Sequence, residues 1–502
     1  MSTRTTRPAP AHRAPATRPD SLSDALRTCA RAAGDEIALV APDGSTLTYR
    51  EWDRRADRVA AALRGRVPPG ATVVVRLGER SDAWFAAALF GAVRSGCFLL
   101  ALDDAAGPDD VSRVATRYGA VVLTPDDVPA DRGRPVLPER APAGGAVVFT
   151  AGTTGPPAAV RWTHADLLTW LTGWTGTPQR RPHLNDFPLH TDAALGRVLR
   201  TLLRYPGMRS PTGRPGTLVR DLTRHRPVDV LLTAAAGRVF TGPRPAGPPA
   251  PVADGVLSVY LAFDFTGPEV LRGLRTAFRN AAVTNVYGVA EAGRGQTWRT
   301  YPAGPDGDPP PGGPGGDPFS DVGVPIFGTE VRVTGPAGAR LGPGRVGRIW
   351  LRPGLAGTLR YCPQDRRPGV FADGWVRTDD AGLIDEAGRL WLGGRAGDLL
   401  PVPGGWLTAQ RVEAVLAAMP EVADVAVTGR AGEPPVLVAS VVPGRPGDAV
   451  PRLMHRRLAD RFGSAAARVR VEPTGAIRRN ALGKAIRWRD PATRAAVEGP
   501  GR

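Results

Sequence analysis

Apolar residues recur at helical spacing near the start of the chain. They do so through residues 47–66, where Thr48 precedes the predicted helix and Glu51 follows three positions later, as in a capping box. An apolar run at 71–77 then predicts a buried strand, and helical and strand-like segments alternate as far as residue 288. This alternation predicts a layered α/β fold with a parallel sheet.

The pattern changes twice towards the C-terminus. Residues 322–393 alternate between apolar and polar positions and predict antiparallel strands. From residue 394 a helix, two strands, a second helix and a last strand predict a compact α+β module. We therefore expect a large α/β domain over 21–393 and a small, mobile C-terminal lid domain over 394–502. A basic arm over 1–20 precedes them and is expected to be disordered.

Composition indicates an ordinary globular protein, because 42% of the 502 residues are hydrophobic. The three cysteines are far apart and fit neither a disulfide framework nor a zinc site. The longest apolar run, at 83–93, is about half of the roughly 20 residues that a membrane helix needs. The N-terminus lacks the apolar segment of a secretory signal. These features predict a cytoplasmic protein with no membrane insertion.

The net charge is +17, and only one of the 65 basic residues, Lys484, is a lysine. Drift in a GC-rich genome accounts for most of the arginines, and chance retention accounts for the lysine equally well. The alternative is that Lys484 makes a contact that needs a compact ammonium group. No nucleic-acid-binding signature accompanies the charge, so we expect no nucleic-acid partner. A basic RNA-binding protein remains an alternative, and it predicts salt-sensitive binding.

Four short strings carry candidate chemistry. They are TAGTTG at 150–155, NVYGVAEAG at 285–293, WVRTDDAGLIDEAGRLWLGGR at 375–395 and IRRNALGKAIRW at 477–488. The first follows an apolar strand, and its small hydroxylated residues let backbone amides approach a polyphosphate. The second offers an aromatic ring and a carboxylate suited to Mg²⁺. Each string alone is equally well explained as an ordinary loop, strand end, hairpin rim or basic tail.

Taken in order, the strings resemble the adenylate-forming superfamily, which includes acyl-CoA synthetases, aryl-acid ligases, luciferase-like enzymes and peptide-synthetase adenylation domains. Its motifs TSGTTGxPKG, YGxTE, TGD, GRxD and GK match TAGTTGPPAA, YGVAE, TDD, GRAG and LGK here. The resemblance covers residues 21–490. It implies ATP-dependent activation of a carboxylic acid as an acyl-adenylate in secondary metabolism. Transfer would follow to the thiol of CoA or of a carrier protein's pantetheine, or to an amine.

The resemblance also implies roles for single residues. Lys484 would neutralise charge between the attacking carboxylate and the α-phosphate, and Glu291 would hold Mg²⁺. His190 would line the acyl pocket, although an ordinary loop histidine explains it as well. The residues implied to bind ATP are Thr150, Gly152, Thr153, Thr154 and Gly155 at the phosphates, Asn285, Tyr287 and Gly288 at adenine, and Asp380 and Arg395 at the ribose.

The chain departs from the family's motifs at several positions. The departures are Ala158 for the phosphate-loop lysine, Ala290 for a threonine, Asp379 for a glycine, Gly397 for the hinge acid or lysine, and Pro401 for a lysine of the second half-reaction. Arg161 is a hypothetical substitute for the missing loop cation. A degenerate nucleotide- or partner-binding scaffold is therefore the competing interpretation. An aryl or alkyl acid is the expected substrate, because no acidic residue at 189–192 clearly matches an amine-binding position, although Asp192 lies nearby.

Overall fold

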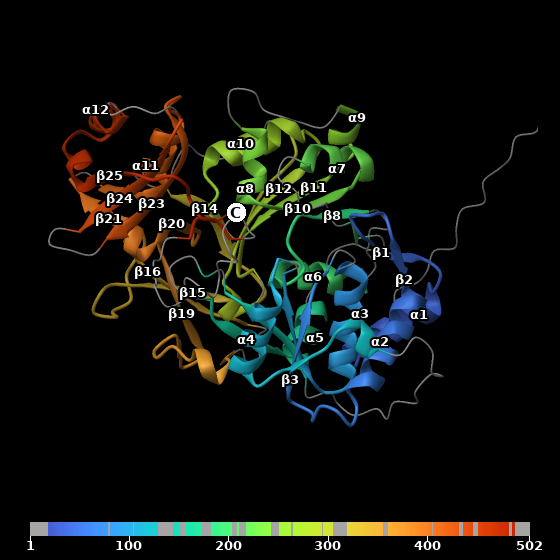
Figure 1. Ribbon diagram of the computed structural model, residues 1–502. Coiled ribbons are helices and arrows are strands. Elements are labelled where there is room, and N and C mark those ends of the chain that lie inside the picture. Colours follow the sequence, from blue (N-terminus) through green and yellow to red (C-terminus); the bar gives the residue numbers. More distant parts are fainter. Residues whose placement is uncertain are drawn as a thin grey trace, which may run out of the picture.

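The computed structural model describes most of the chain. The described residues are 19–78, 81–103, 105–128, 144–150, 152, 157–172, 182–202, 208–209, 217–241, 250–262, 265–293, 295–304, 319–354, 360–403, 405–430, 435–444, 450–480 and 484–486. Within them, two sheets and their covering helices form the larger part, and a separate α+β unit follows towards the C-terminus (Figure 1).

The first sheet has six strands in the order β17-β7-β6-β4-β3-β5. Its parallel strands are β3 (Thr72–Arg76), β4 (Phe98–Leu102), β5 (Val121–Val122) and β6 (Gly145–Phe149), and its antiparallel strands are β7 (Ala159–Thr163) and β17 (Arg360–Tyr361). The predicted parallel sheet is thus confirmed, with an antiparallel edge that follows the phosphate-loop string.

The second sheet has 14 strands and changes character along its width. Its parallel part comprises β1 (Ile37–Val40), β8 (His183–Asn185), β9 (Met208–Arg209), β10 (Asp229–Thr233), β11 (Ser258–Ala262) and β12 (Ala282–Tyr287). Its antiparallel strands are β2 (Thr46–Thr48), β13 (Thr297–Tyr301), β14 (Ser320–Pro325), β15 (Glu330–Thr334), β16 (Gly347–Arg352), β18 (Phe371–Ala372), β19 (Trp375–Ile384) and β20 (Leu390–Arg395). The predicted antiparallel region over 322–393 is confirmed.

Helices cover both faces of these sheets. They are α1 (Leu22–Ala32), α2 (Tyr49–Leu63), α3 (Ser81–Arg94), α4 (Pro108–Tyr118), α5 (His164–Thr172), α6 (Asp192–Thr201), α7 (Leu218–His225), α8 (Ala234–Gly237), α9 (Ala250–Ala253) and α10 (Pro268–Ala277). Helix α2 begins where the sequence predicts, because the Thr48 hydroxyl accepts the Glu51 N–H at 3.2 Å.

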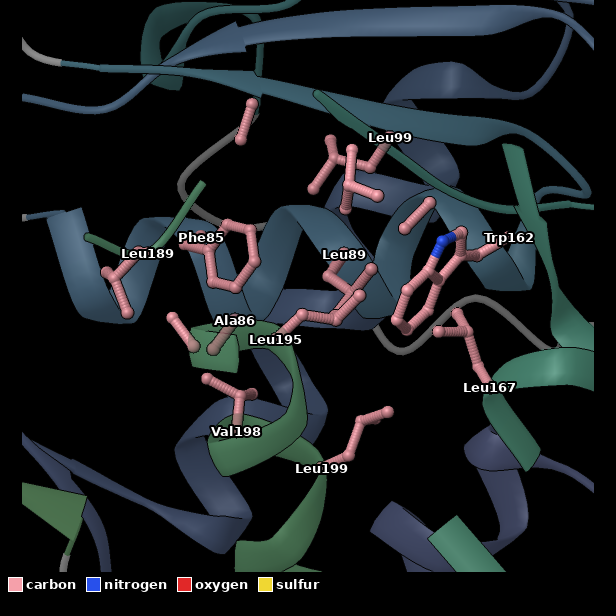
Figure 2. Close-up of a cluster of buried hydrophobic side chains, with 14 of the residues drawn as sticks. Phe85, Ala86, Leu89, Leu99, Trp162, Leu167, Leu189, Leu195, Val198 and Leu199 are labelled. Carbon is pink, nitrogen blue, oxygen red and sulfur yellow. The ribbon is translucent and has the colours of Figure 1, made fainter. Parts of the chain in front are cut away.

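The main hydrophobic core lies between the two sheets. Figure 2 shows Leu89 of α3, Leu167 of α5 and Leu195 of α6 packed beside Leu99 of β4 and Trp162 of β7. Further apolar clusters cover the outer faces, with α4 against the first sheet and α7 and α10 against the second. Strand β4 alternates, with Leu99 on the inner face and the neighbouring Leu100 on the outer face, as a strand buried on both sides requires.

A third unit forms its own core after β20. It contains β21 (Leu399–Val402), β22 (Gly405–Thr408), α11 (Ala409–Ala417), β23 (Val422–Arg430), β24 (Val436–Pro443), α12 (Val450–Phe462) and β25 (Val469–Pro473). Its buried cluster joins Leu400, Val412, Leu437, Met454 and Val469. The elements from α11 onward match the predicted α+β module, whereas the hairpin of β21 and β22 before them was not predicted. The domain boundary at residue 394 remains a prediction. No helix in the described ranges is long and apolar enough to cross a membrane.

Candidate active site

Three of the residues expected at the nucleotide meet where the second sheet turns antiparallel. Asp380 of β19 is opposite Arg395 of β20, and their side chains form an ion pair at 3.2 Å. The Tyr287 hydroxyl, at the end of β12, donates to the other oxygen of Asp380 at 2.9 Å. Asp380 is only 8% exposed. Since each carboxylate oxygen has two acceptor positions, Asp380 can still accept hydrogen bonds from a sugar.

Electrostatics hold this group in defined protonation states. The charge of Asp380 raises the pKa of Arg395 against the opposing effect of burial, and the charges of Asp379 and Glu291 add to the effect. Burial, together with the charge of Asp380, raises the pKa of Tyr287 well above its usual value. Tyr287 therefore stays neutral, and its hydroxyl donates a hydrogen bond to Asp380. Arg395 stays charged beside a cluster of acidic groups.

Glu291 joins the same cluster from a short 3₁₀ turn, Ala290–Ala292. Its Oε1 accepts a hydrogen bond from the Tyr361 hydroxyl at 2.7 Å. Tyr361 lies on the edge strand β17 of the first sheet, and its ring packs edge-on against Phe371 with centroids 5.2 Å apart. Burial, and then the charge of Glu291, raises the pKa of the Tyr361 hydroxyl. The hydroxyl is therefore a permanent donor to one oxygen of Glu291.

The site suits a magnesium ion bound mainly by phosphate oxygens. Mg²⁺ commonly binds one or two carboxylates together with substrate phosphates and water. Across the described ranges, no group of three or more His, Cys, Asp and Glu side chains is placed to hold a metal. Tyr361 occupies Oε1 of Glu291, and Oε2 has no recorded hydrogen bond to the described residues. A single carboxylate supplemented by ATP phosphates fits this donor set.

Lys484 approaches the same region from the C-terminal unit. Its backbone N–H donates to the Asn480 side chain at 3.0 Å, and its carbonyl accepts the Asn480 N–H at 2.9 Å. A β-bridge between Arg479 and Ala485 closes the turn. The positive charge of Lys484 lowers the pKa of Asp192, so the ammonium lies within electrostatic range of the start of α6. The charge of the only lysine thus acts on the larger part of the protein.

Asp192 is an acidic group whose pKa the charge of Lys484 lowers. It is the first residue of α6, after the N-cap Thr191, and is 9% exposed. Burial raises its pKa to about 7, a hydrogen bond from the Ala193 N–H and the charge of Lys484 oppose the rise, and Glu291 adds to it. Sequence analysis noted Asp192 only as nearby. The sequence feature that could have predicted a buried carboxylate is the position of Asp192 at the start of a helix whose other residues are mostly apolar.

The two ends of the phosphate-loop string are joined by hydrogen bonds. Thr150 donates its N–H to the Ala158 carbonyl at 2.9 Å, and its hydroxyl accepts the Ala158 N–H at 3.0 Å. Gly152 has φ +61°, a conformation that favours glycine. Thr153, Thr154 and Gly155 lie outside the described residues. The Thr150 hydroxyl therefore has a structural partner already.

Asp365 supports β7, the strand that follows this loop. The sequence alone did not predict this role of Asp365. Its Oδ2 accepts the Ala159 N–H at 2.7 Å and the Tyr118 hydroxyl at 2.6 Å, and Arg117 pairs with its Oδ1. Asp365 is 8% exposed. It lies four residues after Tyr361, in the segment RYCPQD. Two residues from one short polar and aromatic segment thus support both the phosphate loop and Glu291.

The remaining predicted residues occupy the surroundings of the cluster. Asn285 is buried and donates to the Ser320 hydroxyl at 3.0 Å and to the Asp321 carbonyl at 2.9 Å. Its amide therefore ties β12 to β14. Gly288 follows directly after β12, in the turn towards Glu291. His190 lies in the turn before α6, with its Nδ1 at 3.4 Å from an Asp103 carboxylate oxygen.

The hypothesis that Arg161 replaces the missing loop cation is wrong in this structure. Its guanidinium lies over the Phe98 ring at 4.8 Å and within 3.4 Å of the Thr72 hydroxyl. Phe98 and Thr72 begin their strands, whereas the phosphate-loop string follows the opposite end of the neighbouring parallel strand β6. The side chain is directed away from the loop, because β7 runs antiparallel to β6 and carries Arg161 back along the sheet.

Comparison with known proteins assigns the family. The model of the AMP-binding enzyme family matches residues 26–145 and 138–358, and the model of the AMP-binding enzyme C-terminal domain matches residues 411–484. The chain belongs to the AMP-binding enzyme family, in agreement with the resemblance seen in its motifs.

Curated relatives include ligases and peptide synthetases. The chain is 25% identical to the fatty acid–[acyl-carrier-protein] ligase ScoC of Streptomyces coeruleorubidus, covering 89% of this chain and 91% of that protein. It is 27% identical to the phosphinothricin tripeptide synthetase PhsB of Streptomyces viridochromogenes, over 85% of this chain but only 38% of that synthetase. A feruloyl-CoA synthase from an Amycolatopsis species is 28% identical over 77% of this chain and 81% of its own length.

Solved structures share the fold. The O-succinylbenzoate CoA synthetase of Bacillus subtilis, in complex with ATP and magnesium, aligns with a TM-score of 0.75 and 18% identity, covering 92% of this chain and 98% of that one. McyG A-PCP complexed with phenylalanyl-adenylate aligns with the same TM-score and 17% identity, covering 93% of both chains. These likenesses confirm a large α/β part followed by a small C-terminal unit.

Proposed function

We propose that the protein activates a carboxylic acid with ATP as an acyl-adenylate and then passes the acyl group to a thiol. The observation that carries this proposal is the ion pair of Asp380 with Arg395 at 3.2 Å, together with the electrostatic effect of Lys484, from the C-terminal unit, on Asp192 of the larger part. Glu291, which accepts a hydrogen bond from the Tyr361 hydroxyl, adds a carboxylate whose charge acts on both Asp192 and Arg395. A preorganised cation at developing negative charge is a general means of stabilising a transition state.

In the first step, an oxygen of the substrate carboxylate forms a bond to the α-phosphorus of ATP. The bond from that phosphorus to the bridging oxygen breaks, and pyrophosphate leaves with the electron pair. Lys484 balances the charge on the attacking and α-phosphate oxygens, while Asp380 and Arg395 hold the ribose end. Glu291, oriented by Tyr361, would hold magnesium, which when bound neutralises phosphate charge.

In the second step, the sulfur of a thiol forms a bond to the acyl carbon. The bond between that carbon and the phosphate oxygen breaks, AMP leaves with the electron pair, and the thiol proton passes to solvent. The replacement of a family lysine by Pro401 affects this step rather than the first. We therefore place acceptor recognition on other parts of the C-terminal unit.

The buried carboxylate of Asp192 favours an amino acid as a second candidate substrate, besides the aryl or alkyl acid. A substrate ammonium beside Asp192 would replace part of the hydration that the carboxylate loses on burial. A plain aryl or alkyl acid would instead meet a carboxyl that is about half protonated at neutral pH, because its pKa is about 7. An amino acid substrate therefore favours the ionised form of Asp192, whereas an aryl or alkyl acid favours the protonated form.

Acid-dependent exchange of labelled pyrophosphate into ATP tests the proposed function. A panel of aryl, alkyl and amino acids is screened with the full chain and Mg²⁺. We expect exchange well above background with at least one class of acid. ATP binding without exchange for any acid would instead support the nucleotide-binding scaffold.

A further inference from the structure

A groove lies between α11 and α12 on the C-terminal unit, away from the residues assigned to ATP. It has a volume of about 420 Å³. Its floor is apolar and includes Val415 of α11 and Phe462 at the end of α12. Its rim carries three arginines, namely Arg411, Arg457 and Arg461, and a single carboxylate, Asp460. An apolar floor with a positively charged rim is a surface that favours a partner of complementary pattern.

The rim charges face solvent, so a partner can reach them. Arg457, Asp460 and Arg461 are exposed, and no ion pair with another described residue is recorded for any of them. The guanidinium of Arg411 lies over the Phe462 ring at 5.3 Å and joins the rim to the floor. Helix α12 buries Met454 and Leu458 on its other side, in the core of the unit. The charged side chains of Arg457, Asp460 and Arg461 are thus left outside that core.

Charge complementarity selects the occupant. Residues 1–18 of this chain carry four arginines and no acidic residue, and 487–502 are also net basic, so the chain's own ends are poor partners. A second copy in a two-fold arrangement would place arginine rims against each other. Nucleic acid would leave the apolar floor unused. A negatively charged amphipathic helix satisfies both features, because its apolar face fills the groove while its carboxylates meet the arginines.

We propose that this groove, defined by Arg411, Val415, Arg457, Arg461 and Phe462, docks an acidic amphipathic helix of the protein that carries the acceptor thiol. The inference rests on the proposed function and identifies the acceptor as protein-bound rather than free CoA. The groove lies on the same C-terminal unit as Lys484, the residue assigned to the first step of the proposed function. The ScoC ligase, whose name specifies an acyl-carrier-protein acceptor, is a relative over most of this chain.

Charge reversal on α12 tests the groove, with a matched control on the same helix. The test variant is Arg457→Glu with Arg461→Glu. The control is Arg452→Glu with Arg456→Glu, which makes the same charge change at two exposed positions that do not line the groove. Both variants are made in the full chain and keep every residue assigned to ATP. Acid-dependent pyrophosphate exchange therefore stays within twofold of wild type in both.

Two probes report docking. The first is a fluorescently labelled synthetic helix with leucines on one face and glutamates on the other, followed by anisotropy, with its Glu→Lys counterpart as a reference. The second is purified holo acyl carrier protein as acyl acceptor, with free CoA and phosphopantetheine as small thiols. We expect the test variant to bind the acidic helix at least tenfold more weakly and to lose at least tenfold in kcat/KM for the carrier protein. Acyl transfer from the test variant to small thiols stays near the wild-type rate. The control variant stays near wild type in both assays.

The outcomes separate the two proposals. Weaker helix binding in the test variant without any pyrophosphate exchange in wild type supports the groove and contradicts the proposed function. Exchange in wild type with equal helix binding and equal carrier loading in both variants overturns the groove. Wild-type protein that exchanges pyrophosphate but binds neither probe overturns it as well. Binding of the Glu→Lys helix, or of RNA, at the same site would also contradict the proposed partner.

Discussion

The Tyr361 hydroxyl donates a hydrogen bond of 2.7 Å to Glu291, and this bond joins the edge of the first sheet to the candidate metal carboxylate in the 3₁₀ turn after β12. The two residues are 70 positions apart in the chain. A neutral donor fixed on one oxygen leaves the other oxygen directed away from it. Tyr361 therefore acts as a positioning residue for Glu291 rather than as a catalytic residue.

Replacing Tyr361 by phenylalanine tests this role. The variant keeps the ring contact with Phe371 and removes only the donor. We expect the Mg²⁺ concentration for half-maximal pyrophosphate exchange to rise about 10–100-fold, the effect of one lost hydrogen bond to a charged group. The rate at saturating Mg²⁺ changes less than threefold. An unchanged Mg²⁺ requirement would show that Glu291 does not depend on Tyr361.

Replacing Asp192 by asparagine distinguishes the candidate substrate classes. If the substrate carries an ammonium group, the variant loses a buried ion pair, and KM for the acid rises at least about 100-fold. Affinity in wild type then increases as pH rises through about 7, where Asp192 ionises. If the substrate is an aryl or alkyl acid, the variant has little effect on KM or lowers it. KM measured from pH 6 to pH 8.5 in both proteins decides between the classes.

The same substitution changes the dependence of stability on pH. Asp192 ionises near pH 7 in the folded protein, against an ordinary value of 3.8, so between these values the folded state holds a proton that the unfolded chain has lost. Stability contributed by the protonated carboxyl is therefore lost as pH rises from about 4 to about 7, amounting to about 2–4 kcal/mol. We compare the melting temperature of Asp192→Asn with that of wild type at each pH. The variant-minus-wild-type difference should be roughly 3–6 °C larger at pH 8 than at pH 5. Equal differences at both pH values would contradict the raised pKa.

Replacing Asp380 by asparagine tests the ribose site. The substitution keeps the shape of the side chain but removes the charge that pairs with Arg395 and accepts from Tyr287. We expect ATP to bind about 10–100-fold more weakly, because hydrogen bonds to charged groups contribute about 1.5–3 kcal/mol. Isothermal titration with ATP measures the loss. Tyr287→Phe is the matched control, since it removes one partner of Asp380 and keeps the ring and the carboxylate. Unchanged ATP affinity in Asp380→Asn would show that ATP does not bind at Asp380.

Local patterns predicted the elements better than they predicted the site. Helix α2 and its Thr48 cap follow from periodicity and one hydroxyl, because both depend on neighbours in sequence. The contacts of Tyr361 with Glu291 and of Asp365 with Ala159 join distant segments of chain, so no local spacing encodes them. Arg161 is close in sequence to the missing loop lysine, but closeness in sequence did not predict its position. Strand β7 runs antiparallel to β6 and places the guanidinium over Phe98, and the motif alone does not reveal this strand direction.

Motif order, in contrast, anticipated the central group. Tyr287, Asp380 and Arg395 are brought together as the resemblance implied, because Tyr287 ends β12, Arg395 ends β20 and Asp380 lies opposite Arg395 within β19. The roles assigned to them and to His190, Asn285 and Thr150 in binding ATP or the acid remain predictions. Asp192 was underestimated because its burial depends on the packing of α6 between the sheets, which apolar periodicity alone does not place.

The central claim is that the ammonium of Lys484 acts on the nucleotide held by the larger part of the protein. Acid-dependent pyrophosphate exchange in Lys484→Ala, with ATP affinity measured in parallel, tests it most directly. We predict that exchange falls at least about 100-fold while ATP binding changes little, and that Lys484→Arg restores only a small part of the rate because a guanidinium is broader than an ammonium. Exchange at the wild-type rate in Lys484→Ala would contradict the account.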